Sequence, residues 1–235
     1  MTVAIDVAAN LGRVQARIAA AAKRAGRDPA EVTLIAVCKT MPLDLIQAAV
    51  DAGVRDLGEN RVQEAREKFA AGRPIGVTLH LIGHLQTNKA RHAVQLFDVV
   101  HSLDSERLAE ELHREAERTG KRLPVLIEVN VAGEATKFGV MPGSVGTAVR
   151  WITSRSGLRL AGLMTIAPEV SNPEEVRPVF RALRELRDAH CGVGADGRPL
   201  GLSMGMTGDF EVAIEEGATL VRVGRAIFGP RTQPT

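Results

Sequence analysis

Two kinds of hydrophobic pattern alternate along this chain. Short apolar runs rich in β-branched residues, such as 32–38 and 123–131, are followed by segments with helical spacing of their apolar positions, such as 105–121. Such alternation is typical of parallel strands joined by crossover helices. Eight strand candidates begin at Val32, Val54, Thr78, Asp98, Leu123, Leu158, Pro199 and Thr219. The pattern therefore predicts an α/β fold with a single (β/α)8 TIM barrel, and a doubly wound open sheet is the alternative.

The segment before the first strand candidate has a helical pattern of its own. Its apolar positions fit one stripe of an amphipathic helix that ends near Gly26. We expect one domain over residues 1–235, with this helix at 1–26 and the barrel at 32–231. The helix either covers the bottom of the barrel or serves as a contact surface. The stripe consists of Ile5, Ala8, Leu11, Val14, Ile18 and Ala22.

Composition narrows the class of protein. The chain is 45% hydrophobic and 25% charged, which is ordinary for a soluble globular protein. Its 30 basic and 28 acidic residues are interspersed, and aromatic residues make up only 3%, without tyrosine, so we expect no nucleic-acid partner. Two distant cysteines and the lack of a secretory signal or a roughly 20-residue apolar run predict a reduced, cytoplasmic location and no membrane span.

Lys39 places an amine where a buried strand ends and a helix begins. It closes the apolar run 32–38 and is followed by Thr40, Met41 and Pro42. In a barrel, the carboxyl ends of the strands form the active-site face. An amine in a partly apolar pocket has a lowered pKa, and the neutral amine condenses with aldehydes. Lys39 is therefore a candidate Schiff-base lysine, although a lone lysine that ends a strand is more often a solvated cap.

The last two strand candidates end in glycine-containing loops. Residues 203–209 and Gly224–Ala226 bring backbone N–H groups to helix starts, an arrangement that binds phosphate, and barrels often build a phosphate site from these two loops. The same glycines could also serve only turns and caps. Arg222 precedes Gly224 by two residues, so both should face the barrel interior. One lysine and one phosphate-binding arrangement together suggest pyridoxal 5'-phosphate as a ligand. A guanidinium cannot accept a proton, so Arg222 would leave the pyridine nitrogen of such a ligand unprotonated.

Histidines and carboxylates raise the question of a metal site. Nothing resembles a known ligand pair such as H-E-x-x-H or C-x-x-C, so we expect no metal and interpret the histidines as hydrogen-bonded structural residues. We also assign no catalytic residue among the acidic groups of the helix that begins near 105. The histidines considered are His80, His84, His92, His101 and His190.

Eight ordered motifs together resemble the pyridoxal phosphate homeostasis protein family, over about Val32 to Arg231. The resemblance implies a single barrel like the N-terminal domain of alanine racemase, which is fold type III among pyridoxal phosphate proteins. The motifs are AVCKTMP, LGENRVQEAREK, LHLIGHLQTNKAR, HSLDS, IEVNVAGEATKFGV, LAGLMTIAPE, GLSMGMTGDFEVAIEEG and TLVRVGRAIFGPR.

The same resemblance implies roles for individual residues. Lys39 would form the internal aldimine with pyridoxal 5'-phosphate, and Arg222 would lie beside the pyridine nitrogen. The remaining cofactor-binding residues would be Asn60, Met164 under the ring, Met204, and, for the phosphate, Ser203, Thr207 and the backbone of Gly224 and Arg225. His84 and Lys137 lie in family motifs without an assigned role. The chain departs from the family at Arg61, where tyrosine is commoner, and at Thr207, where serine is commoner.

The function that the resemblance implies is the homeostasis of vitamin B6 and amino acids, without an established reaction. We expect a monomer that buffers the cofactor or delivers it to apoenzymes that require it. One alternative is a weak amino-acid racemase in which His84 or water replaces the tyrosine base of alanine racemase, because this chain has neither a tyrosine nor the second domain that supplies it. Another is a phosphosugar aldolase in which Lys39 attacks the substrate directly.

Overall fold

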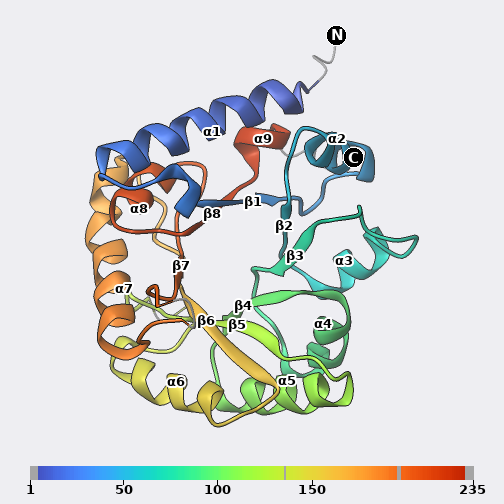
Figure 1. The fold of residues 1–235 in the computed structure, drawn as a ribbon, viewed down its shortest axis with the longest axis vertical. Helices are drawn as coiled ribbons and strands as arrows, with labels where there is room; N and C mark the ends of the chain where they lie inside the picture. Colours follow the sequence, from blue (N-terminus) through green and yellow to red (C-terminus); the bar gives the residue numbers. More distant parts are fainter. Residues whose placement is uncertain (1–4, 135, 195–196, 231–235) are drawn as a thin grey trace.

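Eight parallel strands close into a barrel in chain order, so that β1 pairs with both β2 and β8 (Figure 1). The computed structural model describes residues 5–134, 136–194 and 197–230, so both ends of the predicted domain, including Arg231, lie outside the described residues. The predicted barrel is confirmed, and the open sheet is wrong. The strands are β1 (Thr33–Val37), β2 (Asp56–Glu59), β3 (Thr78–Leu81), β4 (Val99–Leu103), β5 (Leu123–Glu128), β6 (Leu158–Met164), β7 (Gly201–Ser203) and β8 (Leu220–Val223).

Helices surround the barrel and cover the outer faces of the strands (Figure 1). Their buried sides and the outward strand residues form one hydrophobic core. The helices are α1 (Val7–Arg24), α2 (Leu43–Asp51), α3 (Val62–Lys68), α4 (Ala90–Leu96), α5 (Glu106–Arg118), α6 (Val145–Thr153), α7 (Arg177–His190), α8 (Phe210–Glu215) and α9 (Arg225–Phe228), with short 3-10 helices at Pro29–Glu31, Thr87–Lys89, Pro142–Ser144 and Pro173–Val176. Within this described part of the chain, no helix is both long and apolar enough to cross a membrane.

Helix α1 lies on the outside of the ring, against α8, α9 and α2 (Figure 1). Asp6 caps its first turn by accepting a hydrogen bond from the Ala9 N–H at 2.9 Å, and Gly26 follows its end with a φ of 66°. The predicted stripe is confirmed from Leu11 to Ala22 but is wrong at Ile5 and Ala8. Ile5 precedes the helix, and Ala8 lies within it but off the face that carries Val7 and Leu11, which are one helical turn apart. Its members are Val7, Leu11, Val14, Ile18, Ala21 and Ala22.

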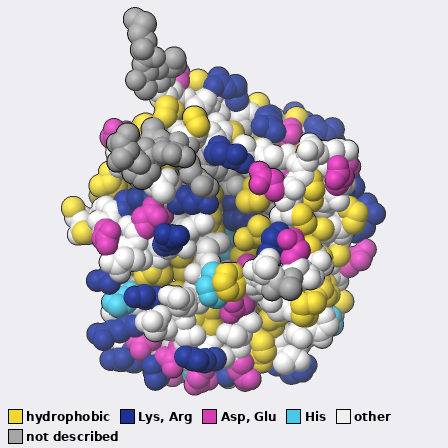
Figure 2. All heavy atoms as spheres, turned by 180° about the vertical axis from the view of Figure 1, so that it is seen from behind, with side chains coloured by type: hydrophobic (Ala, Val, Ile, Leu, Met, Phe, Trp, Pro, Cys, Tyr) yellow, Lys and Arg dark blue, Asp and Glu magenta, His cyan; other side chains and the backbone are white. Residues whose placement is uncertain are grey.

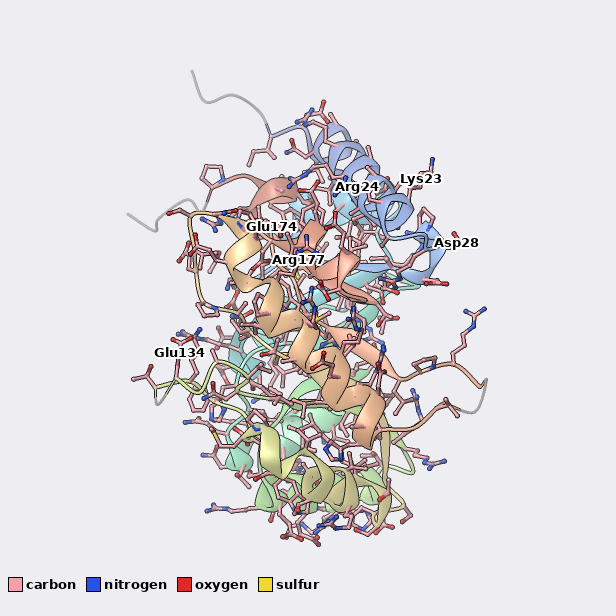
Figure 3. The ribbon with its side chains drawn as sticks, turned by 90° about the vertical axis from the view of Figure 1, so that its left-hand side faces the viewer. Lys23, Arg24, Asp28, Glu134, Glu174 and Arg177 are labelled. Carbon is pink, nitrogen blue, oxygen red and sulfur yellow. The ribbon has the colours of Figure 1, made fainter. Side chains whose placement is uncertain are left out.

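Ion pairs also connect α1 to the outer layer. Arg24 binds Glu215 of α8 at 2.7 Å, and Glu215 also binds Arg177 at 2.7 Å. Figure 3 shows that Arg24 and Arg177 lie on the same outer side of the molecule, with Glu174 beside Arg177. These pairs hold the N-terminal helix to the side of the barrel that carries β7 and β8.

Glycine allows β6 and β7 to approach each other closely. Gly162 has a φ of +149°, and a Cβ atom there would lie 1.9 Å from the carbonyl oxygen of Gly201. Only glycine tolerates both the positive φ and this contact. The close approach sets the register in which Met164 lies opposite Ser203, and so fixes the end of β7 where the predicted site begins.

Candidate functional site

Lys39 lies two residues beyond β1, in the turn that leads to α2, and its side chain is partly buried. The next residue, Thr40, has a φ of 61°, so the chain turns sharply at this point. Glu64 of α3 accepts a hydrogen bond from the Thr40 N–H, which holds the turn in place. The strand and this turn together place Lys39 at the carboxyl-end face of the barrel, and its role there stays a prediction.

A second lysine supports the same turn from below. Lys68 donates to the Cys38 carbonyl at 2.7 Å and to Glu59 at 2.6 Å. Burial lowers the pKa of Lys68, but the hydrogen bond and charge of Glu59 outweigh burial, so the pKa is raised. Lys68 therefore remains a cation bound to carboxylates and is unsuited to condense with an aldehyde. Its bond to the Cys38 carbonyl fixes the backbone next to Lys39. Sequence reasoning missed Lys68, because only the fold brings the end of α3 over the end of β1.

The loop after β7 depends on a glycine in the left-handed region. Gly205 has a φ of +92°, and a Cβ atom there would lie 2.6 Å from the Ala213 Cβ and 2.8 Å from the Phe210 Cα. Asp209 then accepts a hydrogen bond from the Met206 N–H at 2.6 Å and closes the turn. Thr207 lies within this turn and is partly exposed.

The loop after β8 lies next to the end of β1. Val223 pairs with Ala36, and a Cβ atom at Gly224 would lie 3.1 Å from the Val37 carbonyl oxygen. Arg225 follows as the first residue of α9, and its side chain is exposed. The strand order β1, β8, β7 thus brings together the turn of Lys39 and the two glycine loops at one face of the barrel.

Arg222 occupies the barrel interior close to these loops. One Nη donates to the Ser203 Oγ at 2.7 Å and the other donates to the Thr165 carbonyl at 2.9 Å. Burial lowers the pKa of Arg222 to about 10, opposed by the charges of Asp209 and Glu128. The guanidinium therefore remains charged at neutral pH and can only donate hydrogen bonds.

The other predicted cofactor-binding residues lie at the same end of the barrel but differ in exposure. Met164 and Met204 are fully buried, and Asn60 directly follows β2 and is partly buried. Ser203 is also fully buried, and its hydroxyl contacts both Arg222 and His101. A direct contact between Ser203 and a phosphate stays a prediction, because the structure already gives this hydroxyl two partners.

Two of the histidines form buried hydrogen bonds. His80 contacts both Asp56 and His101, and His101 also contacts Ser203. This confirms the interpretation of His80 and His101 as hydrogen-bonded residues. In the parts of the chain that the structure describes, no group of three or more histidine, cysteine or acidic residues is placed to hold a metal ion.

His84 lies at the rim, in a cleft of about 450 Å³ formed by the loops after β3, β4 and β5. Its ring stacks on Phe138 with the ring centroids 3.6 Å apart, and its Nδ1 lies 3.3 Å from Asp104. Lys137 forms an ion pair with Glu134 at 2.6 Å. Figure 2 shows that the face behind that of Figure 1 is hollowed near its centre, with Lys and Arg side chains in and around the depression.

The donor set fits a phosphorylated pyridine aldehyde. Two adjacent glycine loops contain backbone N–H groups and the Thr207 hydroxyl, Lys39 lies in the turn after the neighbouring strand β1, and the Arg222 guanidinium, which can only donate, comes from β8. The close approach of Gly224 to β1 leaves only a tight space for a Cβ atom on that side of the loop. These groups match the phosphate, the aldehyde and the ring nitrogen of such a ligand.

Comparisons with known proteins agree with this geometry. Residues 9–232 match the family model for the alanine racemase N-terminal domain. The chain is 44% identical over 221 residues to the pyridoxal phosphate homeostasis protein of Aquifex aeolicus, covering 94% of this chain and 96% of that protein. The structure of PipY from Synechococcus elongatus with pyridoxal phosphate bound has a TM-score of 0.78 at 35% identity, covering 95% of this chain and all of PipY. Alanine racemase from Bartonella henselae shares the fold, with a TM-score of 0.68 at 17% identity, covering 98% of this chain and 62% of the enzyme.

Proposed function

This chain belongs to the pyridoxal phosphate homeostasis protein family, and on that premise we propose that it binds pyridoxal 5'-phosphate and buffers or delivers it within the cell. The observation that carries the proposal is the convergence of Lys39, Arg222 and the two glycine loops on three neighbouring strands. In this proposal the cofactor is held as a Schiff base to Lys39, and the protein acts as a cytoplasmic monomer. The place of Lys39 just beyond the end of β1, beside the two glycine loops, supports the linkage.

The phosphate would bind at the two glycine loops. Thr207 offers its hydroxyl, and Gly224 and Arg225 offer backbone N–H groups at the start of α9, where intrahelical acceptors are missing. Thr207 is partly exposed in its turn, which supports a direct contact with an anion. The departure from serine at this position keeps the hydroxyl that the contact needs.

The ring would lie between Arg222 and the buried methionines. Arg222 would face the pyridine nitrogen with a group that only donates, so the ring nitrogen accepts and stays unprotonated. Met164, Met204 and Asn60 would bound the ring, and Ser203 would act through Arg222. When bound, the cofactor supplies an electron sink, and an unprotonated ring makes that sink a weak one. This supports storage over demanding chemistry.

Delivery to apoenzymes that need the cofactor is the finer part of the proposal. In this proposal the cofactor is reached from the hollowed face of the molecule (Figure 2). An amine that reaches the linkage can exchange with Lys39, which would release the cofactor. The 235-residue sequence contains no tyrosine, so it lacks the second base that alanine racemase uses.

A weak amino-acid racemase is the second candidate, and Glu128 favours it. This carboxyl ends β5 opposite Met164 and is buried. Burial, with the charge of Asp104, raises the pKa of Glu128 to about 7, against the opposing effect of Arg222. A group with a pKa near the working pH is suited to exchange protons. Deuterium from solvent entering the α-carbon of an amino acid would support racemase chemistry.

Two linked measurements test the proposed function. Borohydride reduction of the protein loaded with pyridoxal 5'-phosphate, followed by peptide mass mapping, should place the cofactor on Lys39. The loaded protein is then mixed with an apoenzyme that requires the cofactor, in the presence of a phosphatase that destroys free pyridoxal phosphate. Reactivation that survives the phosphatase supports delivery. Label on another lysine would contradict the attachment, and reactivation no faster than release of free cofactor would contradict delivery.

A further inference from the structure

An unbroken chain of hydrogen bonds crosses the inside of the barrel, and we call it the lumen relay. It runs from Asp56 at the start of β2 through His80 of β3, His101 of β4 and Ser203 of β7 to Arg222 of β8. The distances are 3.0 Å from Asp56 to His80, 2.9 Å from His80 to His101, 2.9 Å from His101 to Ser203, and 2.7 Å from Ser203 to Arg222.

The relay spans the lumen and does not follow neighbouring strands all the way. His101 and Ser203 belong to β4 and β7, which are separated by β5 and β6 in the ring, so their contact crosses the interior. Both residues are fully buried. Only Asp56 reaches solvent, with 24% of its side chain exposed. The relay thus links a carboxylate at the amino ends of the strands to the guanidinium proposed to face the cofactor.

The two ends of the relay fix the position of every hydrogen in it. Arg222 can only donate, so Ser203 accepts from it, and the Asp56 carboxylate can only accept. With both imidazole rings neutral, the donors therefore run from Ser203 toward Asp56, and Ser203 donates its own hydrogen to the Nδ1 of His101. His101 then carries its hydrogen on Nε2 and donates to the Nδ1 of His80. His80 likewise carries its hydrogen on Nε2 and donates to the Asp56 carboxylate. Each bond in this arrangement uses one hydrogen and one acceptor, so no buried polar atom along the relay lacks a partner.

We propose that the lumen relay is a positioning device that holds the Arg222 guanidinium in one orientation toward the ring nitrogen of the bound cofactor. The proposal rests on the proposed function for the identity of its ligand. The tautomers of His80 and His101 do not depend on that ligand and can be measured in the protein without cofactor. Asp209 and Glu128 also attract the guanidinium from other elements. The relay selects one orientation of the guanidinium, because it offers Arg222 a neutral acceptor, the Ser203 hydroxyl, whose geometry is fixed from the opposite end of the barrel.

The electrostatics of His101 agree with this arrangement. Burial lowers the pKa of His101 well below its usual value, and the neighbouring His80 and Arg222 lower it further. A neutral His101 can accept from Ser203 and donate to His80 at the same time. If it were protonated, the Ser203 hydroxyl would lose its acceptor inside a closed space.

The first test uses the protein without cofactor. Nitrogen-15 labelling of histidine, with long-range proton–nitrogen correlation spectra at neutral pH, reports which ring nitrogen carries the hydrogen. We expect both His80 and His101 to carry it on Nε2, assigned by comparison with His80→Gln and His101→Gln. A hydrogen on Nδ1 of either ring would overturn the relay, whatever the protein binds.

The second test compares His101→Gln with His101→Leu. Glutamine can accept at one end and donate at the other, so it can preserve the direction of the relay, whereas leucine fills similar space without doing either. The cofactor is labelled with nitrogen-15 in its ring, and its chemical shift is measured in the bound state. We expect His101→Gln to keep both this chemical shift and the affinity of the protein for the cofactor. His101→Leu should shift that signal and weaken binding by about tenfold or more, since Arg222 loses an oriented acceptor. A core residue with no positioning role would give the opposite order or no difference.

Variants at Asp56, the partly exposed end of the relay, serve as a control in case the His101 variants fail to fold. Asp56→Ala removes the acceptor of His80, and Asp56→Asn retains one, while both changes lie at a partly exposed position. The alanine variant should move the ring-nitrogen signal in the same direction as His101→Leu, and the asparagine variant should move it less. Equal spectra for Asp56→Ala and wild type would contradict the relay. Absence of cofactor binding by the wild type would instead contradict the proposed function, while the histidine tautomers would still test the relay in the protein itself.

Discussion

The lumen relay and the outer ion-pair network contain polar contacts of similar length in opposite surroundings. The outer network joins Arg24 of α1 and Arg177 of α7 to Glu174, Glu215 and Glu216, with distances of 2.6–3.3 Å (Figure 3). Its members Arg24 and Glu174 expose 52% and 57% of their side chains, whereas the interior members of the relay are at most 4% exposed. Water therefore competes for the contacts of Arg24 and Glu174 in the outer network, although Glu216 there is only 6% exposed, and it does not compete for those inside the relay.

The difference teaches that contact distance alone does not measure importance. Exposed ion pairs are screened by water and salt and contribute about 0–1 kcal/mol each. A buried polar group has no alternative partner, so removal of one member leaves another unsatisfied. The outer network holds α1 and α7 to α8 with several overlapping contacts, while each member of the relay near the proposed cofactor site depends on its neighbours.

Replacement of Arg222, which breaks hydrogen bonds inside the barrel, should have the largest effect on the free energy of unfolding. Arg222→Leu leaves the Ser203 hydroxyl and the Thr165 carbonyl without their donor, and leaves Asp209 and Glu128 without the nearby positive charge. We expect a loss of about 3–5 kcal/mol in the free energy of unfolding, measured by urea denaturation. Arg222→Lys keeps the charge and should lose less. A loss below about 1 kcal/mol for the leucine variant would show that removing a buried polar contact costs no more stability than removing an exposed one.

Glu128 should make the stability of the interior depend on pH. Its pKa is about 7 in the folded protein and about 4.5 when unfolded, so the folded state binds this proton more tightly. The stabilisation is complete below pH 4.5 and is lost as the pH rises through 7, on the order of 3 kcal/mol. Glu128→Gln should therefore flatten the stability profile across this window.

The control for this pH profile lies in the outer network. The hydrogen bond from Arg177 lowers the pKa of Glu174, so that its ionisation favours folding instead of opposing it. Glu174→Gln should retain the fall in stability between pH 4.5 and 7. The same fall in both variants would mean that Glu128 does not cause it.

The backbone conformation at Gly205 gives a further comparison of a closely packed position with an open one. Gly205→Ala places a side chain at a φ of +92° and only 2.6 Å from the Ala213 Cβ, so the loop after β7 must move. We expect a loss of about 1–3 kcal/mol in thermal or urea unfolding, and weaker binding of the cofactor phosphate. Gly208→Ala in the same loop is the matched control, because a Cβ atom there meets nothing within 4 Å. Equal losses in the two variants would refute the packing argument.

Removal of Arg24 should have the smallest effect. Arg24→Ala breaks its pair with Glu215, but Glu215 retains Arg177. The expected loss is below about 1 kcal/mol, and it should diminish further at high salt because the pair is exposed. A loss comparable to that of Arg222→Leu would remove the contrast between the two regions.

The sequence predicted the barrel because alternating strand and helix periods are local signals, and it predicted Lys39, Arg222 and the glycine loops because strand ends converge on one face. It missed the contacts that depend on closure of the ring. The His101–Ser203 bond joins residues that are 102 positions apart, and no local pattern relates them. Lys68 was missed for the same reason. The predicted stripe of α1 was wrong at Ile5, because the helix begins only after its cap at Asp6, and at Ala8, because Val7 and not Ala8 lies on the buried face with Leu11.

The central claim is that Lys39 holds pyridoxal 5'-phosphate covalently at the end of β1. Its most direct test is the visible absorption spectrum of the purified protein with the cofactor, compared with that of Lys39→Ala at equal loading. We predict a yellow band in the wild type that is absent from the variant, while both proteins unfold at similar temperatures. A wild type without the band, or a variant that keeps it, would contradict the account.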